Sequence, residues 1–211
     1  MSDTELIKTA LILVDIQNDF CPGGALAVAH GDEVVEVANR VQAGWFERIV
    51  ATQDWHPADH ASFAINQPGR QPGEVIQLGG MDQVLWPAHC VQGTPGAEFH
   101  PRLDRSRIAR VFQKGTDRTI DSYSGFFDNG HKKSTGLADY LRGEGITDVY
   151  VMGLATDYCV KYTALDARRE GFNTFLIEDG CRGVELAPGD SLRAIGEMKV
   201  AGVMLTTSES V

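Results

Sequence analysis

The sequence predicts an α/β protein, a three-layer α/β/α sandwich around a mostly parallel sheet of about six strands. Short runs rich in β-branched residues recur along the chain, and they are mostly apolar, as in strands buried on both faces. Helical patterns lie between several of these runs. Strands that alternate with helices are joined by right-handed crossovers, so they form a parallel sheet covered by helices.

The elements follow one another in a regular order. Residues 9–14 predict the first strand, and residues 32–45 predict a helix with Val34, Val37, Ala38 and Val41 on one face. A later helix, at residues 159–170, is stopped by Gly171. The remaining strands are predicted at residues 48–52, 108–112, 148–152, 173–177 and 202–206, and the remaining helices at residues 134–142 and 190–199.

The 211 residues suffice for one substantial core, so we expect a single domain over residues 1–211. The stretch at about residues 55–107 breaks the alternation, being rich in Gly, Pro, His and Gln with little periodicity. Such a long connection is uncommon in a compact domain unless it builds a site. We therefore expect this loop region to bind metal and substrate.

The amino-acid composition argues against some classes of binding partner. The formal charge is −10, and no Lys/Arg cluster suited to phosphates is present, so we expect no nucleic acid and no anionic membrane as partner. The start of the chain is polar and acidic, unlike a leader, and we expect a cytoplasmic protein. The four cysteines fit neither a disulfide scaffold nor a zinc ribbon, which favours reduced thiols.

Three reactive side chains fall at the carboxyl ends of predicted parallel strands. Asp15 follows the first strand, Lys114 follows residues 108–112, and Cys159 follows residues 148–152. Open α/β sheets gather their ligands at this edge. Taken singly, each residue has an ordinary explanation: a turn or cap for Asp15, a surface lysine for Lys114, and core packing for Cys159. Their shared position favours a catalytic group.

Cys159 is the best candidate for a nucleophile. It is predicted to open a helix after the turn that begins at Gly153, and a helix N-terminus beside a lysine favours the thiolate. Cys90 is the nearest competitor, but it lies outside any strand-to-helix turn, so we assign it to packing.

A second group of residues has the chemistry of a metal site. Asp54 and His56 are separated by one residue after a strand, so that their side chains point the same way, and His89 lies in the long loop. Asp and His together suit zinc, iron or manganese. Hydrogen-bonded or surface histidines are the alternative explanation for this spacing.

At these residues the chain resembles the nicotinamidase/pyrazinamidase branch of the isochorismatase-like cysteine hydrolases. The matching stretches run in the family's order from about residue 10 to residue 185 and are jointly very specific. They are Val14-Asp15-Ile-Gln17-Asn-Asp19-Phe20, Asp54-Trp-His56, Trp86-Pro-Ala-His89-Cys90, Lys114-Gly115, Asp121-Ser-Tyr123 and Gly153-Leu-Ala155-Thr-Asp157-Tyr158-Cys159.

The resemblance implies a set of residue roles. It implies an Asp-Lys-Cys triad and one divalent metal ion per chain, together with an oxyanion hole formed behind a cis peptide bond. In this sequence the triad is Asp15, Lys114 and Cys159, the metal ligands are Asp54, His56 and His89, the oxyanion hole is formed by the amides of Ala155 and Cys159, and the substrate pocket includes Phe20, Trp86 and Tyr123. The aromatic positions also suit core packing.

Two positions differ among members of the family. His60 is implied either as a fourth metal ligand or as a neighbour of the ligands. Tyr158 precedes Cys159 where some relatives have histidine, and this position bears on substrate preference.

The implied activity is hydrolysis of nicotinamide to nicotinate and ammonia through a cysteine thioester, with pyrazinamide as a second substrate. Two alternatives stay open. A related amidohydrolase would use the same triad on an acyclic carbamoyl or ureido substrate and would lack the metal residues. A regulatory protein with Cys159 as a redox-sensing thiol would leave those residues unexplained. Whether the chain forms a homo-oligomer is also open.

Overall fold

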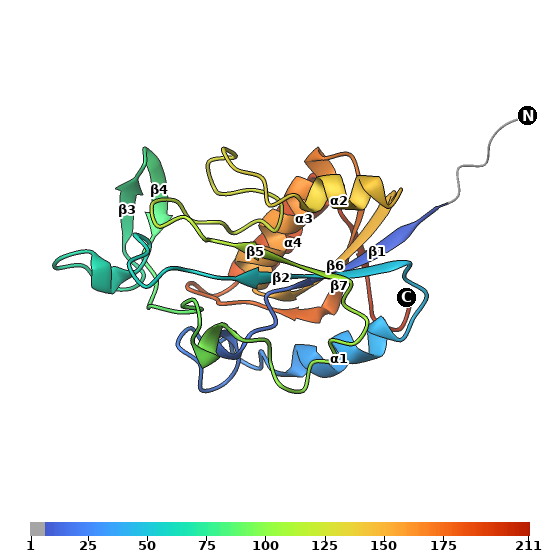
Figure 1. Cartoon of the computed structure of the whole chain (residues 1–211), viewed down its shortest axis with the longest axis horizontal. Helices are drawn as coiled ribbons and strands as arrows, with labels where there is room; N and C mark the ends of the chain where they lie inside the picture. The colour runs from blue at the N-terminus through green and yellow to red at the C-terminus, as the bar shows by residue number, and fades with distance from the viewer. Residues whose placement is uncertain (1–6) are drawn as a thin grey trace, which may run out of the picture.

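Six parallel strands form one sheet with helices on both faces (Figure 1). The computed structural model describes residues 7–211, so most of the acidic start of the chain, on which the expectation of no leader rests, lies outside it. The strand order is β5-β2-β1-β6-β7-β8. The strands are β1 Thr9–Val14, β2 Arg48–Asp54, β5 Arg110–Lys114, β6 Asp148–Leu154, β7 Asn173–Arg182 and β8 Met204–Thr206. The predicted sandwich and its six-stranded sheet are confirmed.

The helices cover the sheet unequally. In Figure 1, α1 lies below the sheet and the other three helices lie above it. The helices are α1 Glu33–Gln42, α2 Leu137–Gly143, α3 Lys161–Arg169 and α4 Asp190–Val200. Helix α1 buries Val34, Ala38 and Val41, as the periodicity predicts, whereas Val37 is only half-buried. Within residues 7–211, no helix combines the length and apolar character needed to cross a membrane.

The two central strands define where a site can form. Every residue of β1 and of β6 is buried. From β1 the chain builds outward through β2 and β5, whereas β6, β7 and β8 extend the sheet on the other side. The order therefore reverses between β1 and β6, and such a switch point leaves a crevice at the carboxyl ends of the strands.

The long connection contains more structure than the sequence pattern suggests. Strands β3 Val75–Leu78 and β4 Met81–Val84 pair as an antiparallel hairpin, and short 3₁₀ turns lie at Ala64–Asn66 and Pro95–Ala97. Gly79 and Gly80 form the turn with φ of 60° and 85°. A Gly-Gly pair between strands is a known hairpin signal, but the poor periodicity around it masked the strands.

Candidate active site

The predicted catalytic residues meet at the switch point of the sheet. Asp15 directly follows β1. Lys114 is the last residue of β5, two positions beyond the predicted end of that strand. Cys159 lies in a π-helical turn, Thr156–Val160, between β6 and α3. Such turns occur often at functional sites.

Lys114 is the centre of this arrangement. Its Nζ lies 2.8 Å from Asp15 Oδ2 and 3.3 Å from Cys159 Sγ. It also lies 2.8 Å from Asp54 Oδ1 and donates to the carbonyl of Ser122 at 2.9 Å. The Lys114 side chain has no exposed surface. One buried ammonium therefore joins the triad to the first of the predicted metal ligands.

Asp15 is held by the neighbouring strand. Its backbone is left-handed, with φ of 47°. The hydroxyl of Thr52 on β2 donates to Asp15 Oδ1 at 2.6 Å and accepts from the Asp15 amide at 3.2 Å. An oxygen of the Asp15 carboxylate lies within 4.8 Å of Cys159 Sγ. The fixed carboxylate is therefore close enough to receive the thiol proton after a small adjustment.

The electrostatics correct one expectation from the sequence. Burial raises the pKa of the Cys159 thiol well above its usual value; the Lys114 ammonium opposes this, and Asp15 adds to it. Burial also raises the pKa of Asp15, again against the effect of Lys114. Cys159 lies inside a π turn rather than at the start of α3. The expectation of a resting thiolate is therefore wrong, and the geometry fits a thiol beside a base of raised proton affinity.

The turn before Cys159 has the backbone form that the resemblance implies. The Leu154–Ala155 peptide bond is cis. The carbonyl of Ala155 accepts hydrogen bonds from the amides of Tyr158 and Val160, both at 3.1 Å. These bonds skip Cys159, whose amide is not used to hold this carbonyl. Ala155 and Cys159 both line the same cavity.

The three predicted metal ligands also come together. Asp54 Oδ2 lies 3.2 Å from His56 Nε2 and 3.5 Å from His89 Nε2. His56 Nδ1 lies 2.9 Å from the carbonyl of Gly115, and His89 Nδ1 lies 2.8 Å from that of Pro87. A carbonyl only accepts, so each ring donates from Nδ1 and turns its Nε2 toward Asp54.

These residues fit a divalent cation. His56 Nε2 is buried and has no hydrogen-bond partner among residues 7–211. Three buried carboxylates, those of Asp15, Asp54 and Asp121, lie in this region with the single ammonium of Lys114. A charge of +2 would balance them, and two imidazoles with a carboxylate form a donor set that zinc and similar ions accept.

His60 has contacts of a different kind. Its Nδ1 accepts from the Ser62 amide at 3.2 Å and lies 2.8 Å from the Ser62 hydroxyl. Its Nε2 lies 3.4 Å from the carbonyl of Ile120. The proton therefore belongs on Nε2, which favours His60 as a neighbour of the metal site rather than a ligand. A ligand atom of His60 still lies within 4.8 Å of one from His56 and one from Asp121.

The metal residues rest on a scaffold that the sequence analysis missed. The Gln17 side chain donates to the Asp54 carbonyl at 2.8 Å and accepts from the Asp54 amide at 2.8 Å. Gly115 has φ of 65°, and a Cβ there would stand 2.3 Å from His56 Cε1. Both residues belong to stretches that carry the family resemblance, but sequence alone cannot show which atoms they touch.

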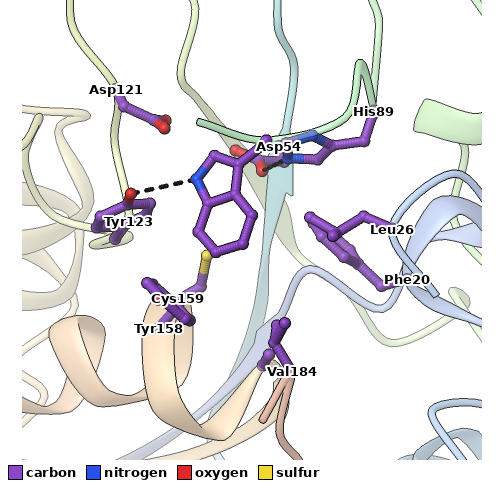
Figure 2. Close-up of a pocket in the computed structure, with 11 residues that line it drawn as sticks. Phe20, Leu26, Asp54, His89, Asp121, Tyr123, Tyr158, Cys159 and Val184 are labelled. Atoms are coloured by element: carbon purple, nitrogen blue, oxygen red, sulfur yellow. Dashed lines mark hydrogen bonds and ion pairs between the residues drawn. The ribbon is translucent and has the colours of Figure 1, made fainter. Parts of the chain in front are cut away.

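An apolar cavity lies above the sulfur of Cys159 (Figure 2). The predicted pocket residues Phe20, Trp86 and Tyr123 all line it. The Tyr123 hydroxyl accepts from Trp86 Nε1 at 3.2 Å and from Gln83 Nε2 at 2.9 Å. Tyr158, the position that the sequence analysis connected with substrate preference, lines it as well, together with three residues that sequence reasoning did not assign: Leu26, Asp121 and Val184.

The remaining cysteines are separate from this chemistry. Cys21, Cys90 and Cys181 are free and buried, as expected for reduced thiols used in packing. The backbone of Cys90 matters more than its thiol, because its amide donates to Asp19 Oδ2 at 2.7 Å and so fixes the loop beside His89.

Comparison with known proteins identifies close relatives. The sequence profile of the Isochorismatase domain matches residues 9–210. A nicotinamidase of Escherichia coli is 54% identical over 202 residues, covering 94% of each chain. The solved structure of an Acinetobacter baumannii nicotinamidase/pyrazinamidase superposes with a TM-score of 0.93 at 48% identity, covering 98% of this chain and 99% of that one. A Pyrococcus horikoshii pyrazinamidase solved with zinc gives 0.77 at 40% identity, covering 95% and 99%.

Proposed function

The chain belongs to the isochorismatase family, and we propose that within this family it hydrolyses nicotinamide to nicotinate and ammonia. One observation carries the proposal: Cys159 lines the same cavity as Asp54 and His89, two of the three residues that suit a metal. A relative 54% identical over nearly the whole chain is a nicotinamidase. The runner-up amidohydrolases on acyclic substrates would have no use for the metal residues.

In the first half-reaction, Asp15 takes the proton from the Cys159 thiol while Lys114 keeps the resulting charges balanced. The sulfur then forms a bond to the carboxamide carbon. The amides of Ala155 and Cys159 hold the developing oxyanion, and each such donor contributes about 2.7–4 kcal/mol in comparable sites. When the carbon–nitrogen bond breaks, Asp15 returns the proton and ammonia leaves.

In the second half-reaction, Asp15 takes a proton from water, and the water oxygen bonds to the thioester carbon. The carbon–sulfur bond then breaks, the proton returns from Asp15 to the sulfur of Cys159, and nicotinic acid leaves and loses its own proton to water to become nicotinate. The raised pKa of Asp15, caused by its burial, suits a group that takes up and returns a proton twice in each cycle.

Asp54, His56 and His89 would hold one divalent ion per chain. Zinc is the first candidate because the Pyrococcus relative was solved with it, and iron and manganese suit the same donors. When bound, the ion supplies an acceptor for the lone pair of the substrate's ring nitrogen. Phe20, Trp86 and Tyr123 then enclose the ring and exclude water from the sulfur. Pyrazinamide, with a ring nitrogen and a carboxamide, should also be hydrolysed.

The decisive experiment measures ammonia released from nicotinamide together with the elements bound to the same preparation. Ammonia in step with nicotinate, from protein holding about one divalent ion per chain, is the expected result. Release from an acyclic ureido substrate but not from nicotinamide would establish the runner-up. A preparation that releases no ammonia from either substrate, while Cys159 reacts readily with peroxide, would favour a redox role.

We also expect a cytoplasmic protein, and cell fractionation tests this expectation. Light scattering would give the oligomeric state of the protein.

A further inference from the structure

A second cavity, open to solvent, adjoins the one above Cys159. Its walls come from the β3–β4 hairpin, the π turn and helices α3 and α4. Tyr123 and Tyr158 line both cavities. The two spaces therefore share these two tyrosines in their walls.

The two tyrosines are held in different ways. Tyr123 is fixed by two hydrogen bonds to its hydroxyl, from Trp86 and Gln83. The half-buried Tyr158 is positioned by its ring contacts: its centroid lies 4.8 Å from that of Trp86 at 87° and 5.3 Å from that of Tyr123 at 65°. Shortening the Tyr158 side chain would therefore break no hydrogen bond with any residue in 7–211.

We propose that Tyr158 is the residue that limits the size of the substrate ring, and that the outer cavity receives ring substituents once Tyr158 is shortened. This inference rests on the proposed nicotinamidase function. The carboxamide carbon must reach Cys159 Sγ, and Tyr158 lines the same cavity as that sulfur, so its ring borders the space that the substrate would occupy (Figure 2). A ring substituent pointing that way meets the tyrosine in the intact protein.

The charges of the outer cavity define which substituents it would accept. Its two basic residues are already paired, Lys161 with Glu197 at 3.1 Å and Arg193 with Asp190. Asp82 and Asp157 add two further carboxylates to its lining. Neutral or cationic substituents should therefore be accepted, and anionic ones rejected.

The test compares kcat/KM for nicotinamide with that for 5-methyl-, 6-methyl-, 5-aminomethyl- and 5-carboxynicotinamide. Rejection of one misfitting methyl in an apolar pocket is typically about tenfold or more. In Tyr158→Ala, the ratio of at least one methyl compound to nicotinamide should rise by about tenfold. The aminomethyl compound should gain and the carboxy compound should not. Unchanged ratios in a variant that still hydrolyses nicotinamide would overturn the proposal.

Matched variants isolate the ring of Tyr158. Tyr158→Phe keeps the ring and should keep the wild-type ratios, whereas gains equal to those of the alanine variant would contradict a size limit. Val75→Ala enlarges only the outer cavity and should leave the ratios unchanged. Equal gains there would also count against Tyr158. If wild-type protein released no ammonia from nicotinamide, the proposed function itself would fail, which is a separate result.

Loss of all turnover in Tyr158→Ala would still leave the proposal testable. Calorimetric binding of nicotinamide and 5- and 6-methylnicotinamide would then be compared in Cys159→Ala and in Cys159→Ala/Tyr158→Ala. A relative gain of about tenfold for one methyl compound in the double variant supports the size limit. Identical relative affinities in the two proteins overturn it.

Discussion

The triad and the metal residues lie within one site, but they are positioned by different kinds of structure. Asp15 and Lys114 lie at the ends of β1 and β5, inside a parallel sheet whose register is fixed over many residues. His56 and His89 lie on the long connection that crosses the carboxyl edge of that sheet. In Figure 1 this connection leads out to the β3–β4 hairpin, beyond the sheet edge.

The connection is nevertheless well anchored. The His56 amide donates to the Cys90 carbonyl at 3.0 Å, and the His56 carbonyl accepts from Gln92 at 2.8 Å. The Trp86 amide donates to the Ser62 carbonyl at 2.8 Å, and the Trp86 carbonyl accepts from the Ala64 amide at 2.9 Å. Isolated backbone bridges thus take the place of a sheet. The comparison teaches that an irregular segment can orient ligands well when its backbone groups are paired across the chain.

The strongest test of the triad side is Cys159→Ala. Turnover should fall by more than about a thousandfold, because no other group supplies the bond to carbon. Metal content and nicotinamide affinity should persist, since the loop side is untouched. Cys90→Ala is the matched control and should keep turnover within a few fold. Steady-state ammonia release measures the turnover of each variant, and elemental analysis measures its metal content. Near wild-type turnover in Cys159→Ala would rule out Cys159 as the nucleophile.

On the loop side, His56→Ala should lose most of its bound metal and show a large rise in KM. The remaining aspartate and histidine offer too few donors for tight binding. His60→Gln should keep the metal, because the His60 contacts favour a proton donor. Elemental analysis after dialysis against a weak chelator measures the metal that each variant retains. Equal metal loss in the two variants would make His60 a ligand, and full activity in metal-stripped protein would contradict the role given to the ion.

Gln17→Leu tests the contact between the segment that follows β1 and the metal residue Asp54. It removes the hydrogen bonds that hold both backbone groups of Asp54, so metal affinity should fall by about 10–100-fold, as for other groups that orient ligands. Gln17→Glu keeps one acceptor and should lose less. Competition with a chromogenic chelator gives the affinity. A fall in melting temperature with unchanged affinity would show that Gln17 supports the fold alone.

The smallest expected effect is that of Thr52→Val, within the sheet. The variant removes the hydroxyl that fixes Asp15 while keeping the shape of the side chain, so kcat should fall by about tenfold with KM nearly unchanged. Thr52→Ser should recover most of the loss. A rise in KM with unchanged kcat would place Thr52 in substrate binding instead of in positioning the base.

Much of this protein was determined by local sequence. Buried apolar runs predict the strands, and polar residues at their ends predict Asp15, Lys114 and Cys159 at one edge, because parallel strands share a direction. The family stretches likewise predict Asp54, His56, His89 and the cis bond before Ala155. These predictions depend on short spans of chain whose geometry varies little.

Only the tertiary structure decided the rest. The pKa of Cys159 depends on burial and on two carboxylates brought from other strands, and the local helix argument therefore gave the wrong direction. The bonds from Gln17 to Asp54 cross 37 residues of sequence, and Tyr158 lines two cavities whose walls come from several elements. Distances between remote atoms set charge, tautomer and cavity shape, and no local pattern encodes such distances.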